Sequence, residues 1–191
     1  MPRTSTPREP PLFRSNDSVG QLRKLNDNYP TPVSLVTELV HRWALPTMMV
    51  WEPCSGDGIL SDALTKRGCK VVATDIARLQ DFFDYTDTLA PTIITNPPFR
   101  YIRPFIDHAF DIGVQKMALV CPERLWACKK GRDQLMRHRP SRWANMDWRE
   151  DYLQKGGSPD RALAVAMWER PHSDSCRYEV WTRSHDADFL V

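Results

Sequence analysis

The fold is decided by residues 48–76, which read MMVWEPCSGDGILSDALTKRGCKVVATDI. Met48–Trp51 and Lys70–Thr74 are short apolar runs typical of buried strands, and Ile59–Lys66 between them has helical periodicity. A glycine-containing loop joins the first strand to the helix. Strand, helix and strand in succession form the unit from which parallel sheets are built.

The same alternation continues along the chain. Further strands are predicted at Thr92–Thr95, Lys116–Cys121, Arg161–Trp168 and Tyr178–Thr182, and a further helix at Ile102–Ile112. We therefore expect an α/β fold with a doubly wound, mostly parallel sheet. In such sheets, ligands bind at the carboxyl ends of the strands.

A helix is also predicted upstream, where apolar residues recur at helical spacing over 33–43. Pro32 suits the first position of this helix, and Thr31 is expected to cap it.

The composition is that of an ordinary globular domain. The 191 residues carry a net charge of +2, with 41% hydrophobic and 26% charged residues, which excludes a disordered chain and a strongly basic nucleic-acid wrapper. The five scattered cysteines include no C-x-x-C pair, so neither a disulfide framework nor a metal site is expected. With no membrane-spanning run and no secretory leader visible, a cytoplasmic location is expected. The oligomeric state is left open.

Two regions depart from this average. Residues 1–27 are rich in proline and are expected to be a flexible arm, followed by a single domain over 28–191. Residues 126–149 carry seven Lys and Arg against two Asp, interleaved with Trp. We interpret 122–160 either as a DNA-contacting insertion or as a solvated basic helix over core tryptophans. The candidate phosphate contacts are Lys129, Lys130 and Arg132.

The most specific motif is Asn96-Pro-Pro-Phe99, which follows a predicted strand. Its two prolines fix the backbone and donate no N–H, so nearby carbonyls can point outward. The Asn96 side chain and the Pro97 carbonyl can accept hydrogen bonds from one amino group, and Phe99 offers a flat face. These features describe a receptor for a planar aromatic amine. A rigid turn would explain the prolines but not the asparagine.

A second motif is the loop Glu52–Gly58, whose glycines let the backbone approach a ligand closely. It is neither G-x-G-x-x-G nor a P-loop, and its acidic residues suit a cationic or hydroxyl-bearing ligand. Asp75 lies about 20 residues further on, where an acid can accept hydrogen bonds from ribose hydroxyls. Asp81 could accept from an adenine amino group beside Phe82, although Phe82 also suits a core position.

In their order and spacing, these segments resemble the S-adenosylmethionine-dependent DNA N6-adenine methyltransferases, in particular small stand-alone members of phage type. The resemblance covers roughly residues 28–125. It implies a Rossmann-like class I methyltransferase fold, S-adenosyl-L-methionine as cofactor, and methyl transfer to the N6 amino group of an adenine flipped out of double-stranded DNA. The catalytic residues it implies are Asn96, Pro97, Pro98 and Phe99. The cofactor-binding residues it implies are Tyr29, Thr31, Glu52, Pro53, Cys54, Gly56, Gly58, Asp75, Ile76, Asp81 and Phe82.

Other functions remain open at this point. The same chemistry could act on adenine in RNA or on a glutamine amide in a protein, since both present a planar NH2 group. A non-catalytic nucleic-acid-binding relative of this fold is a further alternative. A nicotinamide-type enzyme is disfavoured, because it needs a full G-x-G-x-x-G and leaves Asn96–Phe99 without a role.

Overall fold

The computed structural model describes residues 31–149, 162–171 and 174–183. The predicted arm 1–27, Tyr29 and residues 150–160 of the candidate DNA-contacting segment lie outside the described residues. The strands are β1 (Met49–Glu52), β2 (Lys70–Ala73), β3 (Thr92–Thr95), β4 (Lys116–Pro122), β5 (Arg142–Met146), β6 (Leu163–Glu169) and β7 (Arg177–Trp181). The α-helices are α2 (Val33–Trp43), α3 (Ile59–Lys66), α4 (Ile102–Asp111) and α5 (Lys129–Arg137). Short 3₁₀ turns lie at Ile76–Arg78, Phe82–Asp84 and Phe99–Tyr101.

The seven strands form one sheet in the order β2-β1-β3-β4-β6-β5-β7. β1 pairs in parallel with β2 and β3, β3 with β4, and β5 with β7, whereas β6 is antiparallel to both β4 and β5. The sheet is therefore mostly parallel, as predicted. The chain passes from β1 to β2 on one side and then to β3 on the other, which makes the β1–β3 boundary a topological switch point.

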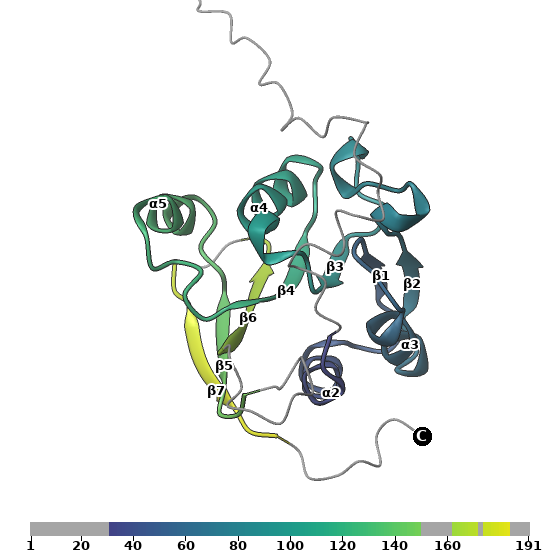
Figure 1. Ribbon diagram of the computed structural model, residues 1–191, viewed down its shortest axis with the longest axis horizontal. Helices are drawn as coiled ribbons and strands as arrows, with labels where there is room; N and C mark the ends of the chain where they lie inside the picture. The colour runs from purple at the N-terminus through teal and green to yellow at the C-terminus, as the bar shows by residue number, and fades with distance from the viewer. Residues whose placement is uncertain (1–30, 150–161, 172–173, 184–191) are drawn as a thin grey trace, which may run out of the picture.

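Helices cover both faces of the sheet. Figure 1 shows α2 and α3 on one face and α4 and α5 on the other. One core cluster joins α2 and α3 to the sheet, and a second joins α4 to the opposite face. β3 and β6 are buried almost throughout because both faces are covered, and this is why they read as continuous apolar runs.

The fold differs from the sequence-based expectation at β5 and at the start of α2. β5 lies inside the sheet between β6 and β7, although its residues belong to the segment interpreted as a candidate insertion. The predicted cap of α2 is wrong, because α2 begins at Val33 after Pro32 and has no side-chain cap. Among the described residues, no helix is both long enough and apolar enough to cross a membrane.

Candidate active site

The loop after β1 leaves space above its backbone. Gly56 has φ +50° and Gly58 has φ +85°, a region that glycine adopts without strain, and Gly58 directly precedes α3. A Cβ atom built on either glycine would meet no heavy atom within 4 Å. A ligand can therefore approach the loop and the first N–H groups of α3 closely.

Asp75, directly after β2 and Thr74, holds this loop in place. Its Oδ2 accepts a hydrogen bond from the Gly56 N–H at 2.8 Å, and its Oδ1 accepts from the Ala77 N–H at 2.8 Å. The side chain is buried, with 5% of the residue exposed. A carboxylate has about four lone-pair positions, which is more than these two bonds use.

Glu52 lies under the loop rather than on it. It is 2% exposed and accepts a hydrogen bond from the Ser61 hydroxyl. Burial, opposed by the Ser61 hydrogen bond and reinforced by Asp75 and Asp62, raises the pKa of Glu52 to about 8. Glu52 is consequently protonated at neutral pH, and its hydrogen bond joins the end of β1 to α3.

Cys54 is similarly a supporting residue. Its side chain packs against the core cluster beneath α4. Burial, together with the nearby carboxylate of Asp75, raises the pKa of the thiol. A neutral thiol is neither a nucleophile nor a metal ligand, which agrees with a structural role. Within the described residues, no group of three His, Cys, Asp or Glu side chains could hold a metal ion.

The segment after β2 places Phe82 differently from the cofactor contact that was expected. The Phe82 ring is 3% exposed and stacks on Phe105 with ring centroids 4.0 Å apart. This corresponds to the alternative in which Phe82 is a core residue. Its neighbour Phe83 is half-buried. Ile76, at the start of the same segment, is 36% exposed and is therefore accessible to a ligand.

Asp81 stays at the surface of this segment. Its side chain is half-buried, and Oδ1 accepts a hydrogen bond from the Phe83 N–H at 3.0 Å. Burial is the largest cause of a raised pKa at this carboxyl group. Asp81 thus keeps an oxygen available to an amino group of a ligand.

Asn96 follows β3, and its side chain contacts the segment before α2. Asn96 Nδ2 donates a hydrogen bond to Thr31 Oγ1 at 3.2 Å. Thr31 therefore holds Asn96 instead of capping a helix. Pro97 is buried, and Phe99 is partly buried where the next 3₁₀ turn begins. No local sequence signal marks this pairing, because the two residues are 65 positions apart.

The ends of β1, β2 and β3 bring these segments together. The three strands are parallel neighbours, so Glu52 at the end of β1, Asp75 after β2 and Asn96 after β3 lie at one edge of the sheet. With strands about 4.8 Å apart, the three positions fall within about 10 Å of one another across the sheet. The glycine loop after β1 and the Asn96 motif thus meet at the switch point.

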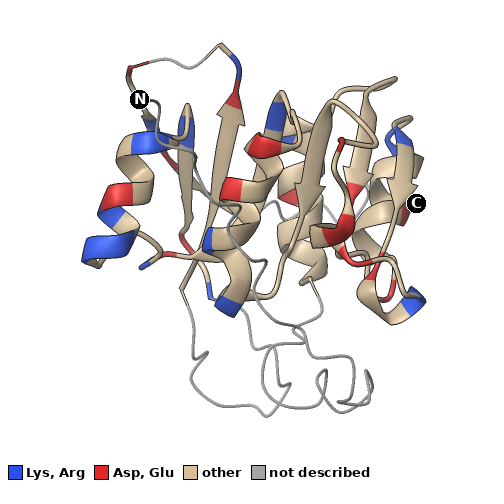
Figure 2. Cartoon of the chain, turned by 90° about the horizontal axis from the view of Figure 1, so that it is seen from above, with Lys and Arg blue, Asp and Glu red and all other residues tan. Residues whose placement is uncertain are grey.

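The basic residues of α5 lie on the opposite side of the molecule from the acidic segments that follow β1 and β2. Lys129, Lys130 and Arg132 are exposed, and Figure 2 shows the blue bands of α5 well separated from the acidic segments near β1 and β2. Arg132 forms an ion pair with Asp133 at 3.0 Å. Arg142, in contrast, is bound to Glu179 of β7 by two hydrogen bonds of 2.8 and 2.9 Å.

No protein-family model matches the sequence, and no curated protein matches it either. Solved structures do resemble it. A predicted O-methyltransferase from Agrobacterium tumefaciens aligns with 79% of this chain and 85% of its own, at TM-score 0.50 and 15% identity. The type IIG restriction endonuclease BpuSI aligns at TM-score 0.58 and 10% identity, over 80% of this chain.

A third similar structure is the methyltransferase subunit of a type I restriction-modification system from Streptococcus thermophilus, at TM-score 0.51 and 13% identity over 81% of this chain. This chain spans 27% of the length of the BpuSI chain and 48% of the length of the subunit. At such low identities the likeness shows the fold, which is the Rossmann-like class I methyltransferase fold.

Proposed function

We propose that this protein transfers a methyl group from S-adenosyl-L-methionine to the N6 amino group of adenine in DNA. The observation that carries the proposal is the Asn96-Pro-Pro-Phe99 motif at the end of β3, beside the open glycine loop at the end of β1. A motif suited to binding an amino group and a loop open to a ligand thus lie at one edge of the sheet. A cytoplasmic location remains a prediction.

The residues around the loop fit the cofactor. Open space lies over Gly56 and Gly58, where a Cβ atom would meet nothing. Asp75 would accept hydrogen bonds from the ribose hydroxyls, Asp81 would accept one from the adenine amino group, and the exposed Ile76 would contact the adenine ring. S-adenosyl-L-methionine supplies, when bound, an electrophilic methyl group.

Asn96 and Pro97 would act on the acceptor nitrogen. The Asn96 amide oxygen and the Pro97 carbonyl would each accept a hydrogen bond from one of its two N–H groups. These bonds would draw the nitrogen lone pair out of conjugation with the ring. The Asn96 side chain is already held by Thr31, so little reorganisation is needed. Catalysis would rest on orientation and hydrogen bonding, and Phe99 would stack on the flipped base.

DNA as the acceptor is supported by the stacking ring of Phe99 and by the exposed cations of α5. Lys129, Lys130 and Arg132 would contact phosphates and make binding weaken with salt. The same Asn96-Pro-Pro receptor suits adenine in RNA or a glutamine amide. The acceptor is therefore what the experiment must decide.

The test is transfer of tritiated methyl groups from the cofactor to duplex DNA, RNA and protein, with nucleoside analysis of the DNA product. We expect N6-methyladenine in DNA. Asn96→Ala should lose about 100-fold or more in rate, because it removes one preorganised hydrogen-bonding group, while cofactor binding persists. Label confined to RNA or protein would contradict the DNA assignment. Absence of transfer to all three acceptors would contradict the methyltransferase assignment.

A further inference from the structure

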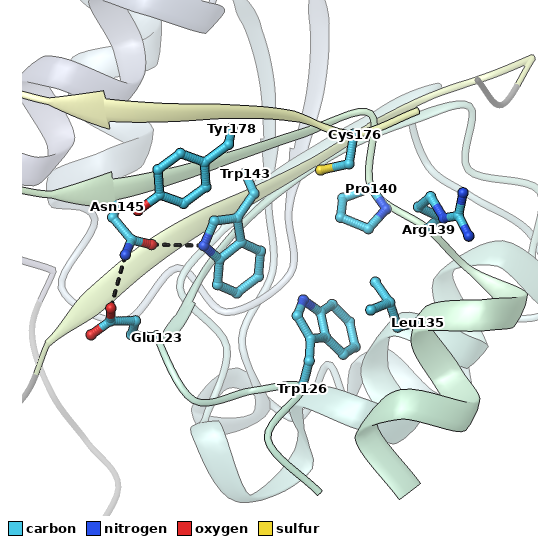
Figure 3. Close-up of a pocket in the computed structure, with 9 residues that line it drawn as sticks. All are labelled: Glu123, Trp126, Leu135, Arg139, Pro140, Trp143, Asn145, Cys176 and Tyr178. Carbon is cyan, nitrogen blue, oxygen red and sulfur yellow. Dashed lines mark hydrogen bonds between the residues drawn. The ribbon is translucent and has the colours of Figure 1, made fainter. Parts of the chain in front are cut away.

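A pocket of about 500 Å³ opens between α5 and the β5–β7 edge of the sheet, apart from the Asn96 site. Its walls are aromatic and apolar side chains, and polar groups stand at its ends (Figure 3). The lining includes Trp126, Trp143, Tyr178, Leu135, Pro140 and Arg139. Its volume falls in the range of small-molecule pockets, about 300–1,000 Å³.

The aromatic walls suit a flat ring. The centroids of the Trp126 and Trp143 rings are 6.0 Å apart at an interplanar angle of 51°. Trp143 is paired with Tyr178 across β5 and β7, so both side chains stand on the same face of the sheet. Tyr178 is 63% exposed, which leaves its ring open to a ligand. Flat apolar rings that converge in this way offer stacking surfaces to any base.

The polar groups suit a base as well. Asn145 accepts from Trp143 Nε1 at 2.6 Å and donates to Glu123 Oε1 at 2.8 Å, which fixes one wall of the pocket (Figure 3). Trp126 Nε1 is buried and has no hydrogen-bond partner among the described residues. Figure 3 shows this nitrogen turned toward the space between Trp143 and Pro140. The pocket thus presents an acceptor in Glu123, and Trp126 Nε1 is an unpartnered donor buried in its wall.

A cation is present for a phosphate. Arg139 lines the pocket and donates one hydrogen bond to the Asp174 carbonyl. A guanidinium carries five N–H donors, so it can bind a phosphate at the same time. The exposed Lys129 and Lys130 begin α5, the helix that forms one side of the pocket.

The pocket is in reach of the same nucleic-acid strand as Asn96. Glu123 follows β4 and Asn145 lies near the end of β5, and these strands run in the same direction as β3. Asn145 and Asn96 therefore lie at one edge of the sheet. Three strand spacings separate β3 from β5, which is about 14 Å and is a distance that a few nucleotides span.

From these contacts we infer that the pocket binds an unpaired base that flanks the target in the nucleic-acid strand, by stacking on the exposed Tyr178 ring and packing against Trp126 and Trp143. The inference rests on the proposed function in taking nucleic acid as the substrate. It adds a second base-binding site to the one at Phe99.

The test is fluorescence anisotropy with labelled short oligothymidylate, which contains no adenine and so no methyl acceptor. Tyr178→Ala should weaken binding about tenfold, the scale of losing one base–aromatic stack, and Tyr178→Phe should bind as the wild type does. The matched control is Val180→Ala, two residues along the same strand at 57% exposure and outside the pocket, which should bind normally. An abasic oligonucleotide of equal length should bind wild type and Tyr178→Ala alike.

The inference is overturned if Tyr178→Ala binds oligothymidylate like the wild type, as it would if the pocket held a peptide. It is also overturned if the abasic strand binds as tightly as oligothymidylate. The proposed function is judged separately, because Asn96→Ala should lose methyl transfer and keep oligothymidylate affinity. A wild type that methylates nothing, alongside a Tyr178→Ala binding defect, would reject the proposed function and retain the pocket.

Discussion

Asn96 and Thr31 are joined by a hydrogen bond from the Asn96 side-chain nitrogen to the Thr31 hydroxyl, at 3.2 Å. This bond fixes the amide with its nitrogen toward Thr31 and its oxygen on the opposite side. Thr31 is thereby a positioning residue for Asn96.

Replacing Thr31 tests this positioning. Thr31→Val removes the hydroxyl while keeping the shape, and kcat for methyl transfer should fall about two- to tenfold, since a hydrogen bond contributes about 0.5–1.5 kcal/mol. Thr31→Ser should restore the rate. Steady-state kinetics with varied cofactor decide the matter. An effect of Thr31→Val on the KM for cofactor alone would mean that Thr31 contacts the cofactor instead.

A substitution at Gly58 tests whether the space over the glycine loop is used by the cofactor. Its effect on cofactor affinity can be separated from the backbone strain that lowers stability. Gly58→Ala and Gly113→Ala both place a Cβ at strongly positive φ, +85° and +92°, and neither Cβ meets another atom. Both should lose about 1–2 kcal/mol of stability in urea denaturation. Cofactor affinity, measured by calorimetry, should fall only in Gly58→Ala. Equal affinities in the two variants would show that the space over Gly58 is not used.

The buried carboxyl group of Glu52 should make stability depend on pH. Its pKa in the folded protein is about 8, above the ordinary 4.5, so the folded state keeps a proton that the unfolded state releases. The stabilisation is complete below about 4.5 and is lost as the pH rises through about 8, at up to about 1.4 kcal/mol per pH unit. Glu52→Gln carries no such proton and should lack this loss.

Urea denaturation over this pH range measures the difference between wild type and Glu52→Gln. The variant should gain stability relative to the wild type as the pH rises. Asp57→Asn, at an exposed position of the same loop, is the control and should follow the wild type. Parallel curves for wild type and Glu52→Gln would show that Glu52 is ionised in the folded protein.

The basic residues of 126–149 should divide into those that bind DNA and those that stabilise the fold. Lys129→Ala with Lys130→Ala should weaken duplex-DNA binding and reduce the slope of log K against log salt by about 0.9 per phosphate contact, with an unchanged melting temperature. Arg142→Ala should instead cost about 2 kcal/mol of stability, because it leaves the Glu179 carboxylate without its two charged hydrogen bonds. A loss of DNA binding with normal stability in Arg142→Ala would reverse this assignment.

The Arg142 effect should also depend on pH. Hydrogen bonds from Arg142 are the largest cause of the lowered pKa of Glu179, about 2. The stability from this pair is therefore present above the ordinary pKa of 4.5 and is lost as the pH falls through about 2. Denaturation of wild type and Arg142→Ala in acid should show their difference shrinking below 4.5. A constant difference would point to lost packing rather than lost charge.

Strands with apolar residues on both faces could be predicted from the sequence, and β5 could not. β3 occupies the predicted residues Thr92–Thr95. Both of its faces are buried, so the strand reads as one uninterrupted β-branched run in the sequence. β5 carries Arg142 and Asn145, whose polar groups are paired with Glu179 and Glu123. Those partners come from distant segments, so the local pattern resembled a surface segment.

The candidate site shows the same limit. Its place at the strand ends follows from the alternation of strands and helices. The hydrogen bond between Thr31 and Asn96 could not be predicted in this way. A threonine before a proline is also a good helix cap, and only the folded chain brings Asn96 beside Thr31. Adjacent Phe82 and Phe83 are chemically alike, and the packing of Phe105 decides which of them is buried.

Because β6 runs antiparallel to β5, the connection between these two strands can be lengthened without changing the sheet. The chain leaves β5 at Met146 and enters β6 at Leu163, and both residues lie at the edge of the sheet that carries Asn96. Extra polypeptide inserted between them starts and finishes at the edge of the sheet that carries Asn96, without lengthening any crossover, and the entropic cost of a longer loop grows slowly. A sequence-reading module grafted there would gain access to the substrate while all seven strands kept their register.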